Sequence, residues 1–440
     1  MLRKLRPAVI AAVALTAALA LTSCSSGGTA SGGDKGTDLA KVDGKGKTLS
    51  VWVMNGDLSQ KTVDAINVKF EKATGAKVKV QIQQWDGITT KLNTALAGSS
   101  APDVVDVGNT QVASYAASGG LADLTSYKSQ LEQGQTWLGG LVDPATIDGK
   151  LYGVPSFAGD RAVVYNKKMW AEAGITTTPT TYDEFTADLD KIKAKNTATN
   201  FSPIYVPGQQ WYVGVQFVWD AGGEIAAKHG SSWKAGFSSA AAQKGLKQFK
   251  EFQNSYSTAA SRTLNTDVPD QDAVFANGQT SALMTTSAHI TKIIGQNAAL
   301  KDEIGTFPLP GISGKNQPVM LGGSVWSVAQ KSKQKDLAAA WTRIAASPEI
   351  QNDYVFGTDN WIPNSEQGIK KAQNSGLNDQ AKGFFTAALR SKATPAAANW
   401  ATIEGDKTME QFFQSIVTGT DVSDAAAKTD AHIETTLNSK

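Results

Sequence analysis

Residues 50–60 read SVWVMNGDLSQ, and this stretch decides the fold class. Residues 51–54 have the apolar character of a buried strand, the run Asn55-Gly56-Asp57 is a turn, and a helical pattern begins at Gln60. A strand, a polar turn and a helix in this order form the first half of a βαβ unit. The stretch therefore predicts an α/β fold with polar groups at the end of a buried strand.

The same alternation continues along the chain. Helices are predicted over 60–74, ending at Gly75, and over 88–97, and further strands over 77–83 and 101–107. This βαβαβα order implies a parallel sheet, whose ligands bind beyond the carboxyl ends of the strands. No phosphate-binding glycine motif follows the strands, which argues against a nucleotide ligand. We therefore expect a crevice lined by the runs Asn55-Gly56-Asp57, Gln84-Trp85-Asp86 and Gly108-Asn109-Thr110-Gln111.

The N-terminal residues predict an exported lipoprotein. Residues 1–23 join a basic start to an apolar run over 7–21, a pattern that is typical of a signal peptide and too short for a comfortable membrane span. The run Leu21-Thr22-Ser23-Cys24 resembles a bacterial lipobox, in which Cys24, the single cysteine, would carry the lipid. The alternative is an ordinary cleavage site beside an unrelated cysteine. Residues 24–47 are rich in Gly, Ser, Lys and Asp and are predicted to be a flexible tether.

Length and charge narrow the class further. The chain has 440 residues, so about 390 follow the tether, which favours two lobes over a single core. Three of the 42 basic residues lie in the predicted signal, which leaves 39 against 40 acidic residues. Because no basic stripe is present, a nucleic-acid partner is not expected. We expect a monomer that uses no cofactor.

Several longer phrases carry a resemblance to a known family. The phrases LSVWVMNGD, APDVVDVGNTQVASYAASGGLADLT, LYGVPSFAGDRAVVYNKKMW and LGGSVWSVAQKSKQKDLAAAW occur in this order. With them the chain resembles bacterial extracellular solute-binding proteins of the maltose-binding type over nearly all of 48–440. The resemblance implies an ABC permease partner and a type II periplasmic-binding-protein fold, in which two α/β lobes close by a hinge at crossover segments. The expected lobes are 48–156 with 310–357, and 157–309 with 358–440.

Sugar recognition needs flat aromatic platforms and planar polar groups. The resemblance implies that Asp57 and Asp160 bind hydroxyls, that Trp400 stacks on a sugar, and that the turn at Gly323 lies near the ligand. Relatives carry Gly-x-Trp where this chain has Thr-Thr-Ser-Ala-His, so His289 stands near the place of an expected platform. Packing of the tryptophans in the core, and pairing of Arg161 with Asp160, are the alternatives. The candidate ligand-binding residues are Asn55, Asp57, Gln84, Trp85, Asn109, Gln111, Asp160, Arg161, Trp211, Tyr212, His289, Gly323, Ser324, Trp361 and Trp400.

Four functions can be compared on these residues. A glycoside hydrolase needs two carboxylates, which Asp57, Asp86 and Asp160 could supply, but no hydrolase motif accompanies them. A metal site is not expected, because the three histidines lack ligand spacing. An importer for a polyol, a glycerophosphodiester or a peptide is the main alternative. We favour a lipid-anchored, non-enzymatic protein that binds a di- or oligosaccharide, with a β-linked sugar preferred.

Overall fold

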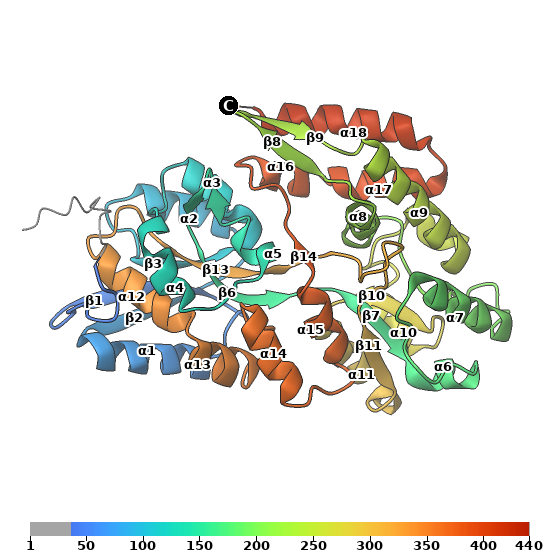
Figure 1. The fold of residues 1–440 in the computed structure, drawn as a ribbon, viewed down its shortest axis with the longest axis horizontal. Coiled ribbons are helices and arrows are strands. Elements are labelled where there is room, and N and C mark those ends of the chain that lie inside the picture. The colour runs from blue at the N-terminus through green and yellow to red at the C-terminus, as the bar shows by residue number, and fades with distance from the viewer. Residues whose placement is uncertain (1–36, 440) are drawn as a thin grey trace, which may run out of the picture. The chain divides into compact units, whose positions relative to one another are not determined.

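A five-stranded sheet is built on the stretch quoted above (Figure 1). The computed structural model describes residues 37–439, and the strands of this sheet are β1 (Thr48–Met54), β2 (Lys77–Gln83), β3 (Val104–Gly108), β6 (Val154–Gly159) and β13 (Gly322–Val328). Their order is β2-β1-β3-β13-β6. Strand β1 pairs in parallel with β2 and β3, which confirms the predicted parallel arrangement. Strand β13 is antiparallel to both of its neighbours, β3 and β6.

The third strand begins later than predicted, at Val104 instead of residue 101. Pro102 has no N–H to donate to a ladder, and Asp103 bonds to the neighbouring strand through its side chain. The N–H of Ser50 donates to the Asp103 carboxylate over 2.9 Å, and the Asp103 N–H donates to the Ser50 carbonyl over 2.9 Å. These two hydrogen bonds connect Asp103 to β1 just before the regular pairing of β1 with β3 begins.

Helices α1 (Gln60–Thr74) and α2 (Ile88–Ala97) form where the periodicity predicts them. The Ser59 hydroxyl caps α1 by accepting the Thr62 N–H, and Gly75 ends it in the left-handed conformation, φ 73°. Helices α1 and α12 (Lys335–Ala345) share one hydrophobic cluster with Val51, Val53 and Trp326 of the sheet. Helices α2 and α3 (Val112–Ala117) share another with Val105, Val107 and Val325. The sheet is therefore covered on both faces.

A second, three-stranded sheet has β7 (Ala162–Asn166) at its centre, antiparallel to β10 (Ala282–Thr285) and β11 (Ile304–Phe307). Its largest cluster contains Trp170, Phe217, Phe249, Trp400 and Phe413. The helices of this part of the chain are α6 (Lys167–Glu172), α7 (Tyr182–Lys195), α8 (Trp211–Asp220), α9 (Ala240–Tyr256), α10 (Gln271–Ala276), α11 (Ser287–Gln296), α16 (Trp400–Gly405), α17 (Thr408–Thr418) and α18 (Val422–Leu437).

Shorter elements connect and flank the two sheets. The hairpins β4–β5 (Thr146–Ile147 and Lys150–Leu151) and β8–β9 (Ala226–His229 and Ser232–Ala235) are antiparallel, and β12 (Val319–Met320) pairs in parallel with β14 (Ser391–Lys392). The remaining helices are α4 (Lys128–Glu132), α5 (Gly139–Val142), α13 (Pro348–Ile350), α14 (Glu366–Asn374) and α15 (Lys382–Ala388). In addition to its pairing with β13, β6 forms an isolated β-bridge with Ile362. The N–H groups of Ala158 and Ile362 each donate to the carbonyl of the other.

The prediction of a flexible tether over residues 24–47 is wrong for residues 37–47, which pack on the folded body. Leu39 is only 3% exposed and belongs to the cluster of α1 and α12. Its N–H donates to Gln130 over 2.8 Å, and Thr37 donates to Asp336 over 2.8 Å. One buried leucine and these two hydrogen bonds therefore anchor a segment whose Gly- and Lys-rich composition predicts a linker. The predicted signal peptide, Cys24 and the rest of the tether lie outside the described residues.

The lobe boundaries stay a prediction. Strand β6 runs to Gly159 and β7 begins at Ala162, so the first crossing between the sheets would lie at Asp160-Arg161. Within residues 37–439, no helix combines the length and the apolar character that a membrane span requires.

Candidate functional site

The polar turns after β1, β2 and β3 meet at one edge of the sheet, as the sequence predicts. The Asn55 amide donates to the Gln84 side chain over 3.2 Å. The Trp85 ring lies over Gly108, where a Cβ would stand 3.7 Å from the indole. Trp85 is 41% exposed, so part of its side chain is accessible to a ligand.

Asp57 lies at this edge of the sheet and is 8% exposed. The Ser324 hydroxyl donates to its Oδ2 over 2.6 Å, and the Trp361 indole donates to its backbone carbonyl over 2.6 Å. Burial raises the pKa of Asp57 to about 6, although hydrogen bonds from Ser324 and Trp85 lower it. At neutral pH the side chain is therefore ionised and can accept hydrogen bonds from hydroxyl groups.

The turn that carries Ser324 depends on glycine at position 323. Gly323 has φ 138°, and a Cβ there would lie 2.2 Å from the carbonyl oxygen of Phe157. Only a residue without a side chain allows β13 and β6 to approach so closely at this end. This close approach of the two strands places Ser324 against Asp57, and a position of the turn near the ligand stays a prediction.

Asp106 was not predicted from the sequence. It lies in β3, is 1% exposed, and accepts the Met54 N–H over 3.1 Å. Burial and the charge of Asp57 raise the pKa of Asp106 well above its usual range. The available signal was an acid between two valines, in a strand that is otherwise apolar.

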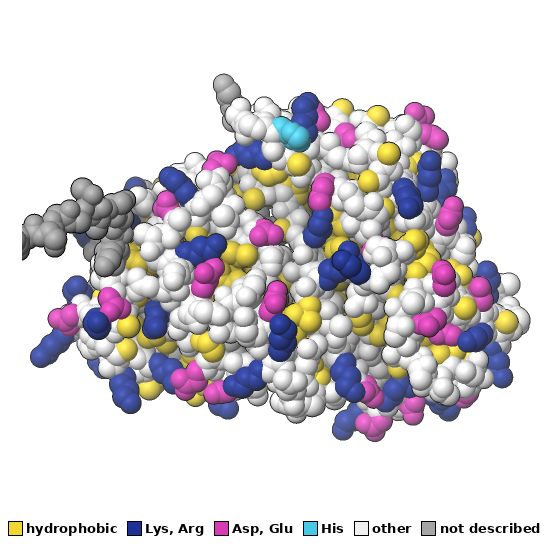
Figure 2. Space-filling view, in the orientation of Figure 1, with side chains coloured by type: hydrophobic (Ala, Val, Ile, Leu, Met, Phe, Trp, Pro, Cys, Tyr) yellow, Lys and Arg dark blue, Asp and Glu magenta, His cyan; other side chains and the backbone are white. Residues whose placement is uncertain are grey.

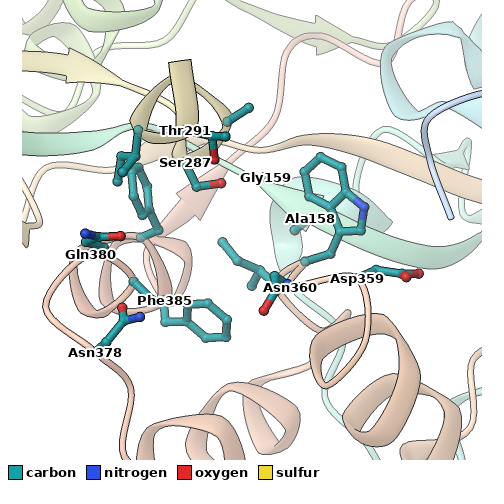
Figure 3. Close-up of a pocket in the computed structure, with 15 residues that line it drawn as sticks. Ala158, Gly159, Ser287, Thr291, Asp359, Asn360, Asn378, Gln380 and Phe385 are labelled. Carbon is teal, nitrogen blue, oxygen red and sulfur yellow. The ribbon is translucent and has the colours of Figure 1, made fainter. Parts of the chain in front are cut away.

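A cavity of about 420 Å³ lies beside Trp361 and is called the Trp361 cavity below (Figure 3). It is bordered by the end of β6, the start of α11, the loop 359–362 and the region of α15. No lysine, arginine or histidine stands among the described residues that line it. Its walls combine aromatic rings with amide and hydroxyl groups, which include Ser287, Asn360, Trp361, Asn378, Gln380 and Phe385.

Trp361 connects this cavity with Asp57. A second cavity of about 540 Å³ is lined by Asn55, Asp57 and their neighbours, and Asp359 and Trp361 line both cavities. A flat aromatic ring beside carboxylate and amide groups suits the apolar face and the hydroxyl rim of a sugar ring. Ser287, at the start of α11, occupies the region where the sequence predicts an altered platform.

Asp160 follows β6 and is 2% exposed. Neither of its carboxylate oxygens accepts a hydrogen bond from another described residue. Burial raises the pKa of Asp160 well above its usual range, and the charge of Arg161 opposes this rise. The Arg161 guanidinium itself stacks on the Tyr212 ring, 3.9 Å from the ring centroid. The structure therefore brings Asp160, Arg161 and Tyr212 together but leaves the acid without donors.

Trp400 and Trp211 differ from their predicted roles. Trp400 is 0% exposed and Trp211 is 3% exposed, so both belong to the core and neither offers an open platform. Trp211 stacks on Tyr212 with 3.9 Å between centroids and meets Trp400 edge-on at 6.5 Å. Their polar sequence contexts suggested turns, but α8 and α16 begin at these residues and turn the indoles inward.

Three other predicted ligand residues have protein partners. His289 places Nδ1 2.8 Å from both carboxylate oxygens of the buried Asp272 and does not line the Trp361 cavity. The Asn109 amide donates to the carbonyls of Gly140 and Leu321 over 3.1 and 2.9 Å, so it braces the backbone. Gln111 accepts the Tyr115 hydroxyl over 3.3 Å. A binding role for any of them stays a prediction.

Comparison with known proteins gives a consistent result. The family described as bacterial extracellular solute-binding protein matches residues 55–352. The chain is 36% identical over 415 residues to the diacetylchitobiose binding protein DasA of Streptomyces coelicolor, covering 93% of this chain and 95% of the relative. It is 23% identical over 365 residues to the maltodextrin-binding protein MdxE of Bacillus subtilis, covering 80% and 79%.

Solved structures show the same fold. The sugar-binding protein MalE from Xanthomonas citri superposes with a TM-score of 0.77 at 23% identity, covering 89% of this chain and 97% of the other. A cyclo/maltodextrin-binding protein superposes with a TM-score of 0.75 at 19% identity, covering 90% and 100%. The fold is thus the predicted two-lobed periplasmic-binding-protein fold of type II.

Proposed function

Because this chain belongs to the bacterial extracellular solute-binding proteins, we propose that it is the substrate-binding component of an ABC importer and captures a di- or oligosaccharide. It would hold the sugar between its two lobes, deliver it to a permease and leave it chemically unchanged. The relative at 36% identity is described as binding diacetylchitobiose, which makes that β-linked disaccharide the first ligand to test.

The chemistry of the Trp361 cavity carries this proposal. Its described lining joins aromatic rings to amides and hydroxyls, with Asp359 as its single charged residue. A phosphorylated ligand such as a glycerophosphodiester would require cations there, and the cation predicted for the crevice, Arg161, is stacked on Tyr212. Figure 2 shows basic and acidic side chains interspersed over the face in view. These features favour an uncharged, polyhydroxylated ligand.

Asp160 supports the same ligand class. A buried carboxylate without donors is costly, whereas sugar hydroxyls can donate to it in pairs. A ligand that supplies these donors together with contacts to Trp361 and Asp57 would favour the closed arrangement of the lobes. We therefore place the ligand at the crossing between the sheets.

Thermal unfolding in the presence of a sugar panel tests the function. Diacetylchitobiose, cellobiose, maltose, a polyol and glycerophosphocholine would each be added to the purified protein. A bound sugar at 100 times its Kd should stabilise the fold by about 2.7 kcal/mol and be recovered intact by mass spectrometry. The Trp361→Ala variant, with Trp233→Ala as a matched tryptophan control, should weaken binding by about 1–3 kcal/mol. A stabilising polyol or phosphodiester, with no response to any sugar, would overturn the proposal.

We also propose that Cys24 is lipidated and holds the protein at the outer face of the cell membrane. The support is the run Leu21-Thr22-Ser23-Cys24 after an apolar segment. The Cys24→Ser variant should appear in the culture medium, and radiolabelled fatty acid should mark the wild type alone. Retention of Cys24→Ser in the membrane fraction would contradict lipid anchoring.

A further inference from the structure

Two carboxyl groups meet beneath the candidate site, and ligand binding uses only one of them. We propose that Asp106 is a positioning residue that keeps its proton at neutral pH and donates a hydrogen bond to the ligand-binding carboxylate of Asp57. The inference rests on the proposed function for the role of Asp57, but the shared proton can be tested without any sugar.

The geometry requires a proton between the two groups. Asp57 Oδ2 already accepts the Ser324 hydroxyl over 2.6 Å, and Asp106 Oδ2 accepts the Met54 N–H over 3.1 Å. Oδ1 of Asp106 is buried and accepts no hydrogen bond from another described residue. Asp106 and Ser324 lie on the same face of the sheet, because Ser324 pairs with Gly108, two residues after Asp106 on β3. Since Asp57 accepts the Ser324 hydroxyl, its carboxylate and that of Asp106 come within hydrogen-bonding reach there. Two ionised carboxylates cannot form such a bond, so one of them must carry a proton.

The groups that face the pair do not supply a compensating cation. Ser324 of β13 and the Trp85 indole contribute hydrogen bonds, and the Met54 N–H belongs to β1. The carboxylate of Asp359, which accepts the Ser59 N–H over 3.2 Å, lines the adjoining cavity together with Asp57. Within residues 37–439, no lysine or arginine is among the groups that shift the pKa of either acid. Burial therefore favours a pair that carries one negative charge instead of two.

The proton belongs on Asp106. Asp106 is 1% exposed and Asp57 is 8% exposed, so the charge is less costly on Asp57 at the cavity wall. In agreement, the pKa of Asp57 is raised to about 6 and that of Asp106 is raised further above its usual range. At neutral pH Asp57 is then an anion whose orientation is fixed by Ser324 and by Asp106. Its remaining lone pairs are directed to a ligand.

The Asp106→Asn variant tests the proton through stability. In the unfolded chain an aspartate has a pKa of about 3.9, so native wild type holds a proton that the unfolded state releases. Unfolding therefore becomes easier for wild type as pH rises from about 4 toward the raised pKa of Asp106. Asparagine keeps a donor and has no proton to lose. We expect Asp106→Asn to melt above wild type at pH 8, with a gap that narrows toward pH 5.

Sugar binding supplies the second readout. Asp106→Leu should bind the sugar identified in the panel at least about tenfold more weakly, and Asp106→Asn should restore affinity to within about threefold. A melting temperature of Asp106→Asn below wild type, or a gap that does not depend on pH, would overturn the proposal. If Asp106→Asn does not fold, carboxyl ¹³C NMR of wild type replaces it. The same spectrum of Asp160→Asn removes the other buried aspartate with a strongly raised pKa. A protonated aspartate signal that remains at pH 7 in Asp160→Asn supports the proposal, and its absence refutes it.

The outcomes separate this inference from the proposed function. If the difference in melting temperature between Asp106→Asn and wild type depends on pH but the protein binds no sugar, the shared proton is supported and the proposed function is contradicted. If the protein binds sugar but this difference does not depend on pH, the proposed function is supported and the role of Asp106 is contradicted.

Discussion

Replacing Asp160 with asparagine should lower sugar affinity by about a hundredfold or more while raising the melting temperature of the unliganded protein. The carboxylate is 2% exposed and neither oxygen has a hydrogen-bond partner among the described residues. Asparagine keeps one acceptor oxygen but loses the other and the charge. Hydrogen bonds to a charged group contribute about 1.5–3 kcal/mol each, so losing one and weakening the other amounts to about 3 kcal/mol. At pH values where the carboxyl group is ionised, the unliganded protein gains because a buried charge without hydrogen-bond donors is removed.

The sign of the pH dependence adds a second check on Asp160. Burial raises its pKa, so native wild type binds a proton that the unfolded chain releases, and its stability falls as pH rises above about 4. The stability gap between Asp160→Asn and wild type should therefore widen with pH. Isothermal titration calorimetry and thermal unfolding over pH 5–8 measure both effects. Asp302→Asn, an exposed acid outside the candidate site, is the matched control, and wild-type affinity in Asp160→Asn would exclude the ligand role.

Replacing Trp400 with alanine should destabilise the fold by about 3–5 kcal/mol. The indole is 0% exposed and belongs to the cluster that contains Ile403, Met409 and Phe413. Removing it leaves a large cavity that the surrounding helices cannot fill. Denaturant unfolding of Trp400→Ala measures the loss, and Trp400→Phe should recover part of it.

The same variant decides between the two roles of Trp400. A core residue costs stability first, and any loss of sugar binding follows from partial unfolding. If Trp400→Ala unfolds within about 1 kcal/mol of wild type but no longer binds sugar, the stacking role implied by the family resemblance would be restored.

Local patterns predicted the first part of the fold well. The strands and helices over 48–108 follow from alternation, apolar periodicity and the stop at Gly75, all of which act within a few residues. The antiparallel insertion of β13 between β3 and β6 was not predictable in this way. Ser324 pairs with Gly108, and no local signal connects strands that are so far apart in the sequence.

The sequence indicated which types of residue lie at the strand ends more reliably than it indicated which side chains are buried. Asp57, Gln84 and Trp85 follow directly from strand ends, and the structure places them at one edge. The contacts that fix them join distant segments, such as Ser324 with Asp57 and Trp361 with Asp57. The inward positions of Trp400 and Asn109, and the anchoring of Leu39, depend on such packing, so their sequence context was misleading.

The two edge strands of the five-stranded sheet, β2 and β6, are protected from pairing with another chain in different ways. Ile362 covers the free side of β6, whereas β2 has no neighbour beyond it among the described strands. Strand β2 presents Lys77 and Lys79 to solvent, and a desolvated lysine opposes pairing with another chain. The β2 edge therefore opposes edge-to-edge aggregation through two ammonium groups and not through a covering segment.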